Sequence, residues 1–197
     1  TPGALANWQS AEAAYLQFRS NKDWINARKQ LALAVGIGKR LMETTKARAE
    51  YKLLATAEAE QKISAALTAA NASEGLPRIQ AEYRAIRSAW VDPFNAGKYK
   101  EATPAYRKLL AVSTQLLDSV DYLAVYEGAR EAITGADSAC QYPPVGNAPA
   151  KKKVDAYAAE RTKVDALVQA RDFLGAKALL PKLKTAAAEV QAALATG

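Results

Sequence analysis

The side chains that most often carry catalysis are scarce in this chain. Its 197 residues include 20 Asp and Glu but no histidine, which removes the commonest general base and the most frequent metal ligand. Glu127 and Glu131 are four positions apart and would share one helix face, as paired carboxylates do in catalytic and metal sites. No second glutamate-rich helix matches them, and Glu127 is spaced for an ordinary ion pair with Arg130. The sequence therefore predicts no catalytic residue, no metal site and no cofactor.

Two further motifs suggest chemistry only weakly. Cys140 is the single cysteine, so no intrachain disulfide or CxxC pair can form, and no histidine is present to activate its thiol. The run from Gly36 to Lys39 has part of a phosphate-binding loop. It lacks the preceding strand and the full spacing, and it lies within an apolar helical stripe. We interpret Cys140 as an incidental loop residue and the two glycines as a place where helices pack closely.

Tyrosines and lysines are the residues that could bind a partner. Tyrosine is favoured where one end of the ring is buried and the other is wet, so four of the nine tyrosines are candidates. One basic run, with Lys177, Lys182 and Lys184 further on, could hold an anionic partner such as nucleic acid through phosphate contacts. The candidate partner-binding residues are Tyr99, Tyr106, Tyr122, Tyr126, Lys151, Lys152 and Lys153.

The composition favours an all-α fold. Half of the residues are hydrophobic, and strong helix formers outnumber the β-branched residues. No stretch approaches the roughly 20 apolar residues that a membrane span needs. The expected location is the cytoplasm, with export left open as an alternative.

A short pattern returns three times, about 75 residues apart. Each copy has an aromatic residue with an alanine three positions later, and a second aromatic 16 residues upstream of the first. The aromatic pairs are Trp8 with Trp24, Tyr83 with Tyr99, and Tyr157 with Phe173, and the alanines are Ala27, Ala102 and Ala176. A fixed period is typical of arrays in which neighbouring copies bury each other's apolar faces. We therefore expect these aromatic residues to serve in packing.

The second copy resembles the tetratricopeptide repeat. Gly97, Tyr99 and Ala102 match the turn glycine, the aromatic and the small residue of that family, over about 15 residues. The resemblance implies two antiparallel helices, with the aromatic ring in the wedge between them and the alanine allowing the backbones to close. It is limited to the turn and the second helix, because the period of about 75 residues departs from the family's period of about 34.

The three copies imply three related helical segments with about eight helices in total. The first segment has either three helices or one long second helix, and the third has two helices and is truncated or a cap. The expected boundaries are 1–74 for the first segment, 75–139 for the second, 140–150 for a linker and 151–197 for the third.

Several helix breaks are expected within these segments. A break or bend is predicted near Thr44, and the acidic residues at 118–121 predict a new helix start. Pro104 would begin a helix with Thr103 as its cap, and Pro181 would kink the helix that contains it.

These observations favour a non-enzymatic function. We expect a structural or protein-interaction module of a larger, bacterial polypeptide, because alanine- and leucine-rich helical units resemble spacer segments of very large bacterial proteins. Its partner would be another protein or neighbouring repeats of the same polypeptide. One alternative is a binding module for nucleic acid or another acidic surface, through the basic third segment. Another is an accessory or effector-type enzyme domain.

Overall fold

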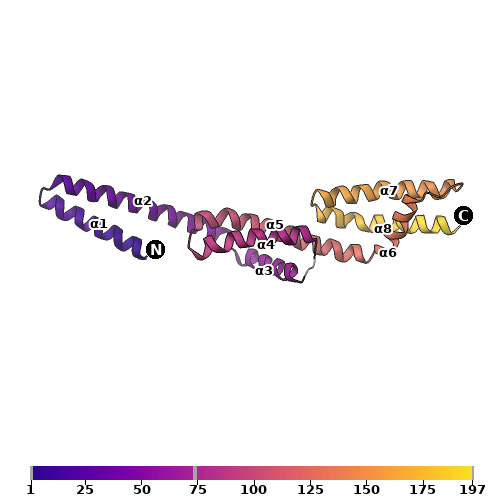
Figure 1. Cartoon of the computed structure of the whole chain (residues 1–197), viewed down its shortest axis with the longest axis horizontal. Coiled ribbons are helices and arrows are strands. Elements are labelled where there is room, and N and C mark those ends of the chain that lie inside the picture. Colours follow the sequence, from indigo (N-terminus) through magenta and orange to yellow (C-terminus); the bar gives the residue numbers. More distant parts are fainter. Residues whose placement is uncertain (1, 73–74, 197) are drawn as a thin grey trace. The chain divides into compact units, whose positions relative to one another are not determined.

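Helices make up almost all of this chain. The computed structural model describes residues 2–72 and 75–196, and within them it contains eight helices and no strand (Figure 1). The helices are α1 (Pro2–Ser20), α2 (Trp24–Leu54), α3 (Ala57–Asn71), α4 (Pro77–Asn95), α5 (Tyr99–Glu127), α6 (Arg130–Gln141), α7 (Ala148–Gln169) and α8 (Phe173–Ala195). The all-α fold and the number of helices are confirmed. Ser73 and Glu74, at the expected boundary between the first two segments, lie outside the described residues.

The three turns α1–α2, α4–α5 and α7–α8 have the same backbone conformation. Each contains one residue in the left-handed region, namely Lys22 (φ 59°), Gly97 (φ 68°) and Arg171 (φ 62°). The amide of the next residue donates to the carbonyl five positions earlier, which is the Schellman ending of a helix. These bonds run from Asp23 N to Phe18 O, from Lys98 N to Pro93 O and from Asp172 N to Leu167 O, at 2.9, 2.8 and 2.9 Å.

The repeated aromatic residues and alanines that follow the three turns are expected to be packed, and the structure agrees only in part. The alanines Ala27, Ala102 and Ala176 are all buried, so the two helices approach closely there. Phe173 is buried as expected, with 2% of its surface exposed. Trp24, at the equivalent place in the first segment, is 64% exposed, so the expectation that it serves in packing is wrong.

The structure has no helix break at Thr44 and no new helix start at 118–121, while a bend near Thr44 stays a prediction. Helix α2 continues through Thr44, whose hydroxyl donates to the Arg40 carbonyl at 2.9 Å and so stays within the helix. The break occurs at Ala55 and Thr56, where the Thr56 hydroxyl accepts from the amide of Ala59 and caps α3. Helix α5 likewise continues through residues 118–121 and ends at Glu127.

The prolines are accommodated inside helices. Helix α5 begins at Tyr99, so Pro104 is not its first residue and Thr103 is not its cap. The Thr103 hydroxyl instead donates to the Tyr99 carbonyl at 2.7 Å. Helix α8 extends on both sides of Pro181, and the kink expected there stays a prediction.

The chain packs into two compact units that cut across the three sequence segments. The first compact unit is Thr1–Glu60 with Ile86–Lys108, and the second is Gln61–Ala85 with Leu109–Gly197. In the first, α1 packs along α2 through small buried residues such as Ala11 and Ala34. The second has the larger apolar core, in which α6, α7 and α8 pack on one another. No helix in the described ranges is long and apolar enough to cross a membrane.

Replacing the left-handed residue of the first turn, Lys22, by glycine should stabilise the protein. Lys22→Gly should raise the free energy of unfolding by about 0.5–1 kcal/mol, because glycine relieves a left-handed strain of about 1–2 kcal/mol but adds entropy to the unfolded chain. Gly97→Ala is the reverse control. A Cβ there would meet no atom within 4 Å, so only backbone strain is added and stability should fall by a similar amount. Urea unfolding followed by tryptophan fluorescence measures both, since all three tryptophans lie in the first compact unit. Equal changes of the same sign in the free energy of unfolding of both variants would contradict the left-handed conformation of Lys22 and Gly97.

Candidate interaction surface

An aromatic cluster lies in the first compact unit and contains two of the four candidate tyrosines. The ring of Tyr51 lies 5.0 Å from that of Tyr106, 5.4 Å from Phe94 and 5.5 Å from Tyr99. The indole of Trp90 donates to the Tyr51 hydroxyl at 3.2 Å. Burial raises the pKa of Tyr51 to about 12, although the bond from Trp90 acts in the opposite direction. These rings pack against one another at the end of α2, the end of α4 and the start of α5.

The Tyr106 hydroxyl is an exception within this cluster. The side chain is 2% exposed, and the hydroxyl has no hydrogen-bond partner among the described residues. Burial and the negative charge of Glu60 raise the pKa of Tyr106, so the hydroxyl stays protonated. Tyr106 is not among the residues that line the four hollows of the described first unit that involve α2. We therefore interpret it as a core residue.

The other two candidate tyrosines belong to the second compact unit. The rings of Tyr122 and Tyr126 are 5.9 Å apart, and Tyr122 lies 6.2 Å from the ring of Phe173. The guanidinium carbon of Arg161 lies 5.8 Å from the centre of the Tyr126 ring. Tyr122 is buried and Tyr126 half-buried. The four candidate tyrosines thus belong to two clusters, one in each compact unit.

A polar network that the sequence did not reveal links α6 to α7. The Tyr157 hydroxyl donates to Asp137 Oδ1 at 2.6 Å and lies 3.3 Å from the Ile133 carbonyl oxygen. Arg161 Nε lies 3.6 Å from the same carboxylate oxygen. Burial, followed by the bond to Asp137, raises the pKa of Tyr157 well above its usual range. The carboxylate is held by a tyrosine and an arginine, so this group serves to fasten two helices together.

The thiol of Cys140 lies near this network. Burial, together with the charges of Asp137 and Asp155, raises the pKa of Cys140. A thiol that keeps its proton is a poor nucleophile. Cys140 lies within α6, so the expectation that it is a loop residue is wrong. That it is incidental stays an interpretation.

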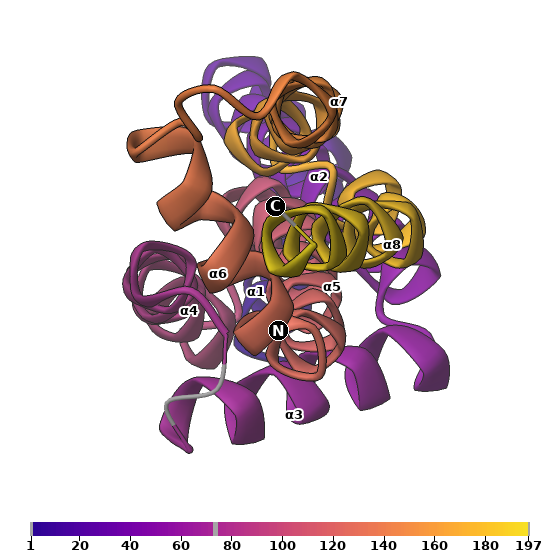
Figure 2. The ribbon, with the colours of Figure 1, turned by 90° about the vertical axis from the view of Figure 1, so that its right-hand side faces the viewer.

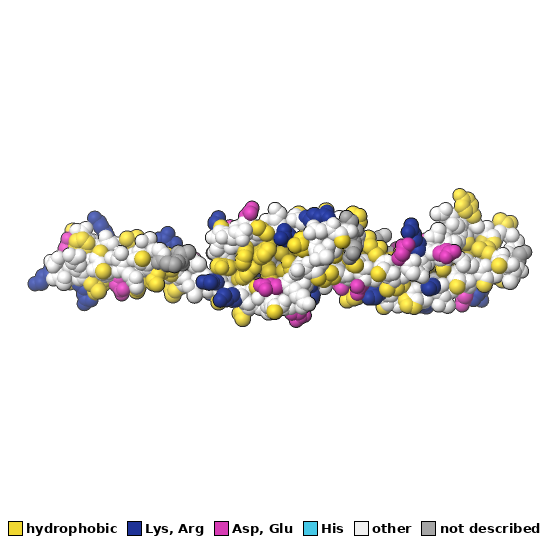
Figure 3. Space-filling model, turned by 90° about the horizontal axis from the view of Figure 1, so that it is seen from below, with side chains coloured by type: hydrophobic (Ala, Val, Ile, Leu, Met, Phe, Trp, Pro, Cys, Tyr) yellow, Lys and Arg dark blue, Asp and Glu magenta, His cyan; other side chains and the backbone are white. Residues whose placement is uncertain are grey.

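Most lysines of the basic third segment are paired. Lys153 lies 2.7 Å from Glu189, Lys177 lies 3.0 Å from Asp121 and Lys182 lies 2.9 Å from Glu160. Lys184 donates to the Gly128 carbonyl at 3.3 Å, while Lys151 and Lys152 are exposed at the start of α7. On the face drawn in Figure 3, basic side chains are spread in small groups with acidic ones among them. This arrangement does not concentrate positive charge as a phosphate-binding surface would.

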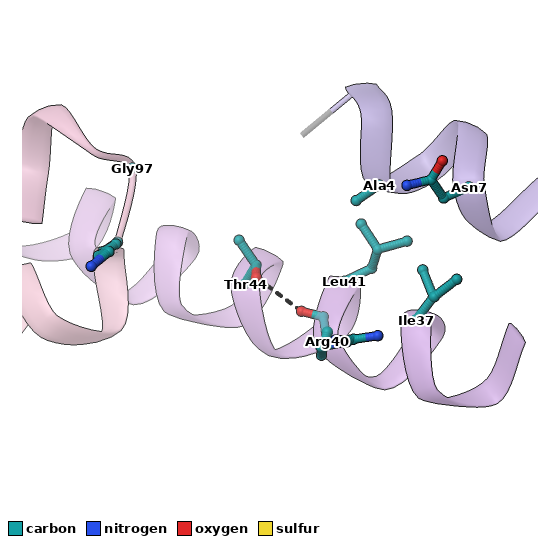
Figure 4. Close-up of a pocket in the computed structure, with 8 residues that line it drawn as sticks. Ala4, Asn7, Ile37, Arg40, Leu41, Thr44 and Gly97 are labelled. Carbon is teal, nitrogen blue, oxygen red and sulfur yellow. Dashed lines mark hydrogen bonds between the residues drawn. The ribbon is translucent and has the colours of Figure 1, made fainter. Parts of the chain in front are cut away.

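The hollow shown in Figure 4 offers little chemistry. It measures about 490 Å³, and Ala4 and Asn7 of α1 face Ile37 and Leu41 of α2 across it. Its arginine, Arg40, donates through Nε to the backbone of its own helix at 3.3 Å. No carboxylate is among the residues that line it. Within the described parts of the chain, no group of three or more Cys, Asp or Glu could hold a metal ion.

Exposed apolar side chains gather on α1 and α2. Nine of the 14 exposed large apolar residues of the described chain lie on these two helices, and this concentration distinguishes them from the other six helices. They are Leu5, Leu16, Trp24, Ile25, Leu31, Leu33, Val35, Met42 and Leu53.

Part of this apolar surface is hollowed. We call it the Trp8 groove. It has a volume of about 380 Å³, and its lining includes Trp8, Glu12, Tyr15, Leu31, Gly38 and Met42. The indole of Trp8 rests over Gly38, where an added Cβ would lie 3.3 Å from Trp8 Nε1.

Comparisons with protein-family models, with curated proteins and with solved structures give no match for this chain. Its function is therefore inferred from its own contacts and surfaces.

Proposed function

We propose that this protein is a non-enzymatic structural or protein-interaction module that contacts its partner through the exposed apolar side of the α1–α2 hairpin. The concentration of exposed apolar side chains on these two helices supports the proposal. Trp24 and its neighbour Ile25 are 64% and 73% exposed at the start of α2, and Met42 is 67% exposed further along the same helix. Large exposed apolar surfaces mark interaction sites because water does not solvate them favourably.

The alternative of an anionic partner has less support. Three lysines of the third segment are already paired with carboxylates, so a polyanion would have to displace those ion pairs before it could use them. Lys163 also pairs with Glu160, and Lys184 donates to the Gly128 carbonyl. The two lysines at the start of α7, Lys151 and Lys152, are too few to give strong phosphate binding.

Site-specific cross-linking tests the proposed surface. A photoreactive phenylalanine analogue placed at Trp24 should give a discrete cross-linked protein species in cells that make the full chain. The same analogue at Lys108, which is exposed on α5 in the same compact unit, is the matched control. Ile25→Asp should suppress the Trp24 product, because a carboxylate beside Trp24 disfavours burial of this part of the apolar surface. Identical products from Trp24 and Lys108, or none from either, would refute the proposal.

A further inference from the structure

The residues around the Trp8 groove have counterparts on α7 and α8. The repeat places Tyr157 at the position of Trp8, Arg161 at that of Glu12 and Gln191 at that of Met42, each 149 positions later. The turn residues Lys22 and Arg171 have the same spacing and the same left-handed conformation, which fixes this register.

The counterparts of the groove are covered by α6. Tyr157 contacts Ile133 and Asp137, Arg161 pairs with Asp137, and Gln191 Nε2 lies 3.5 Å from the Ala132 carbonyl oxygen. Figure 2 shows α6 beside α8 and joined by a short loop to α7, in agreement with its packing on both helices. The surface that corresponds to the Trp8 groove is therefore a helix-binding surface in the third segment.

Helix α4 is contacted by the short helix that precedes it in the same way. Tyr83, the counterpart of Trp8 in the second segment, donates its hydroxyl to the Ile63 carbonyl of α3 at 2.9 Å. Arg84 on the next position of α4 donates to the Ala70 carbonyl of the same helix. In both later segments, the tyrosine that replaces Trp8 thus contacts a backbone carbonyl of the short helix that precedes it in the chain.

Equivalent apolar side chains differ in exposure between the two hairpins. Leu180 on α8 is 1% exposed, whereas its counterpart Leu31 on α2 is 44% exposed. Phe173, whose ring lies 6.2 Å from that of Tyr122 on α5, is 2% exposed, whereas its counterpart Trp24 is 64% exposed. Side chains of the same apolar character are buried on the covered hairpin and exposed on the uncovered one.

We propose that the Trp8 groove binds an amphipathic α-helix of about three turns that lies across α1 and α2 as α6 lies across α7 and α8. This inference rests on the proposed function and names its partner by chemistry. Helix α6 itself has 12 residues and buries Ile133, Ala136 and Ala139. The partner helix therefore carries an apolar residue and small residues with this spacing on one face.

The charges predict one specific difference from α6. Asp137 of α6 faces Arg161, but the groove has Glu12 at the position of Arg161. A helix suited to the groove should carry lysine or arginine where α6 carries Asp137, because an acidic residue there would be repelled by Glu12.

Synthetic peptides of residues 128–141 provide the probe. Labelled peptides are titrated with the full chain, and binding is measured by fluorescence anisotropy. The Asp137→Lys peptide should bind about tenfold more tightly than the unaltered peptide, which corresponds to about 1.4 kcal/mol. The Glu12→Lys protein should reverse this preference. Met42→Asp in the protein, or Ile133→Asp in the peptide, should remove binding, with circular dichroism confirming that each protein variant is folded.

Three outcomes would overturn the inference. The first is that neither peptide binds, and the second is that Glu12→Lys leaves the preference unchanged. The third is concentration-dependent self-association in sedimentation that Met42→Asp abolishes while no peptide binds, which would make a second copy the occupant. Cross-links at Trp24 without peptide binding would refute the helical partner and leave the interaction module standing. Peptide binding that Met42→Asp removes, together with cross-links at Trp24, would support both the groove and the interaction module.

Discussion

Replacing Gly75 by alanine should lower the free energy of unfolding by about 2–3 kcal/mol, the largest loss expected from adding a single methyl group to this chain. Gly75 has φ +84°, so an alanine would add left-handed strain. Its Cβ would also lie 2.9 Å from Leu116 Cδ1 and 2.9 Å from Ser119 Oγ. Both neighbours belong to the fully buried side of α5, and the Ser119 hydroxyl already donates to the Leu116 carbonyl at 2.7 Å. The added methyl group therefore cannot be accommodated by a simple rotation of surface side chains.

Gly146→Ala is the matched control for this substitution. Gly146 has φ +81°, close to that of Gly75, but no atom lies within 4 Å of the position of an added Cβ. Its loss should be about 0.5–1 kcal/mol, which is backbone strain less the entropy removed from the unfolded chain. Urea unfolding followed by far-ultraviolet circular dichroism measures both variants, and the m-value should stay constant. Equal losses at the two glycines would mean that Gly75 does not press against α5.

The repeated motif indicated which three turns are equivalent, and their shared geometry is decided locally. Gly97 suits a left-handed residue, and Asp23 and Asp172 cap the helices that follow, with bonds to Asn26 N and Gly175 N. These features lie within a few residues of one another, so their recurrence along the sequence predicted a recurrent geometry.

The helix breaks could not be placed as reliably, because threonine supports two opposite outcomes. At Thr44 the hydroxyl bonds back to its own helix, while at Thr56 it caps the next one. No glycine or proline lies near Thr56 to indicate the break. Residues far away in the sequence decide between the two outcomes.

Which side chains are free at the surface depends even more on contacts between residues that are distant in the sequence. Lys177 and Asp121 are 56 positions apart, and so are Lys184 and the Gly128 carbonyl. The sequence therefore predicts a basic surface from the lysines of the third segment, whereas most of these lysines are paired in the structure. The exposure of Trp24 escaped prediction for a related reason, since a repeated motif indicates which residues are equivalent but not whether a neighbouring helix covers them.

Two buried tyrosines should respond in opposite ways to the loss of one oxygen atom. Tyr157→Phe should lower the free energy of unfolding by about 2 kcal/mol, because it removes a hydrogen bond to a charged group. The Tyr157 hydroxyl lies 2.6 Å from Asp137 Oδ1, and without it Arg161 at 3.6 Å is left to stabilise that oxygen of the carboxylate. The variant is measured by urea unfolding followed by far-ultraviolet circular dichroism.

Tyr106→Phe is the matched control and should be neutral or raise the free energy of unfolding by up to about 1 kcal/mol. Tyr106 is as fully packed as Tyr157, but its hydroxyl is buried without a partner in the described structure, so phenylalanine removes an unfavourable burial and no bond. The ring contacts with Tyr51 and Trp90, at 5.0 and 5.9 Å, involve no hydroxyl and should persist. A loss of stability in Tyr106→Phe equal to that in Tyr157→Phe would show that the Tyr106 hydroxyl is bonded in solution. The sign of the difference between the two variants therefore separates a hydroxyl that fastens α6 to α7 from one that an aromatic core merely tolerates.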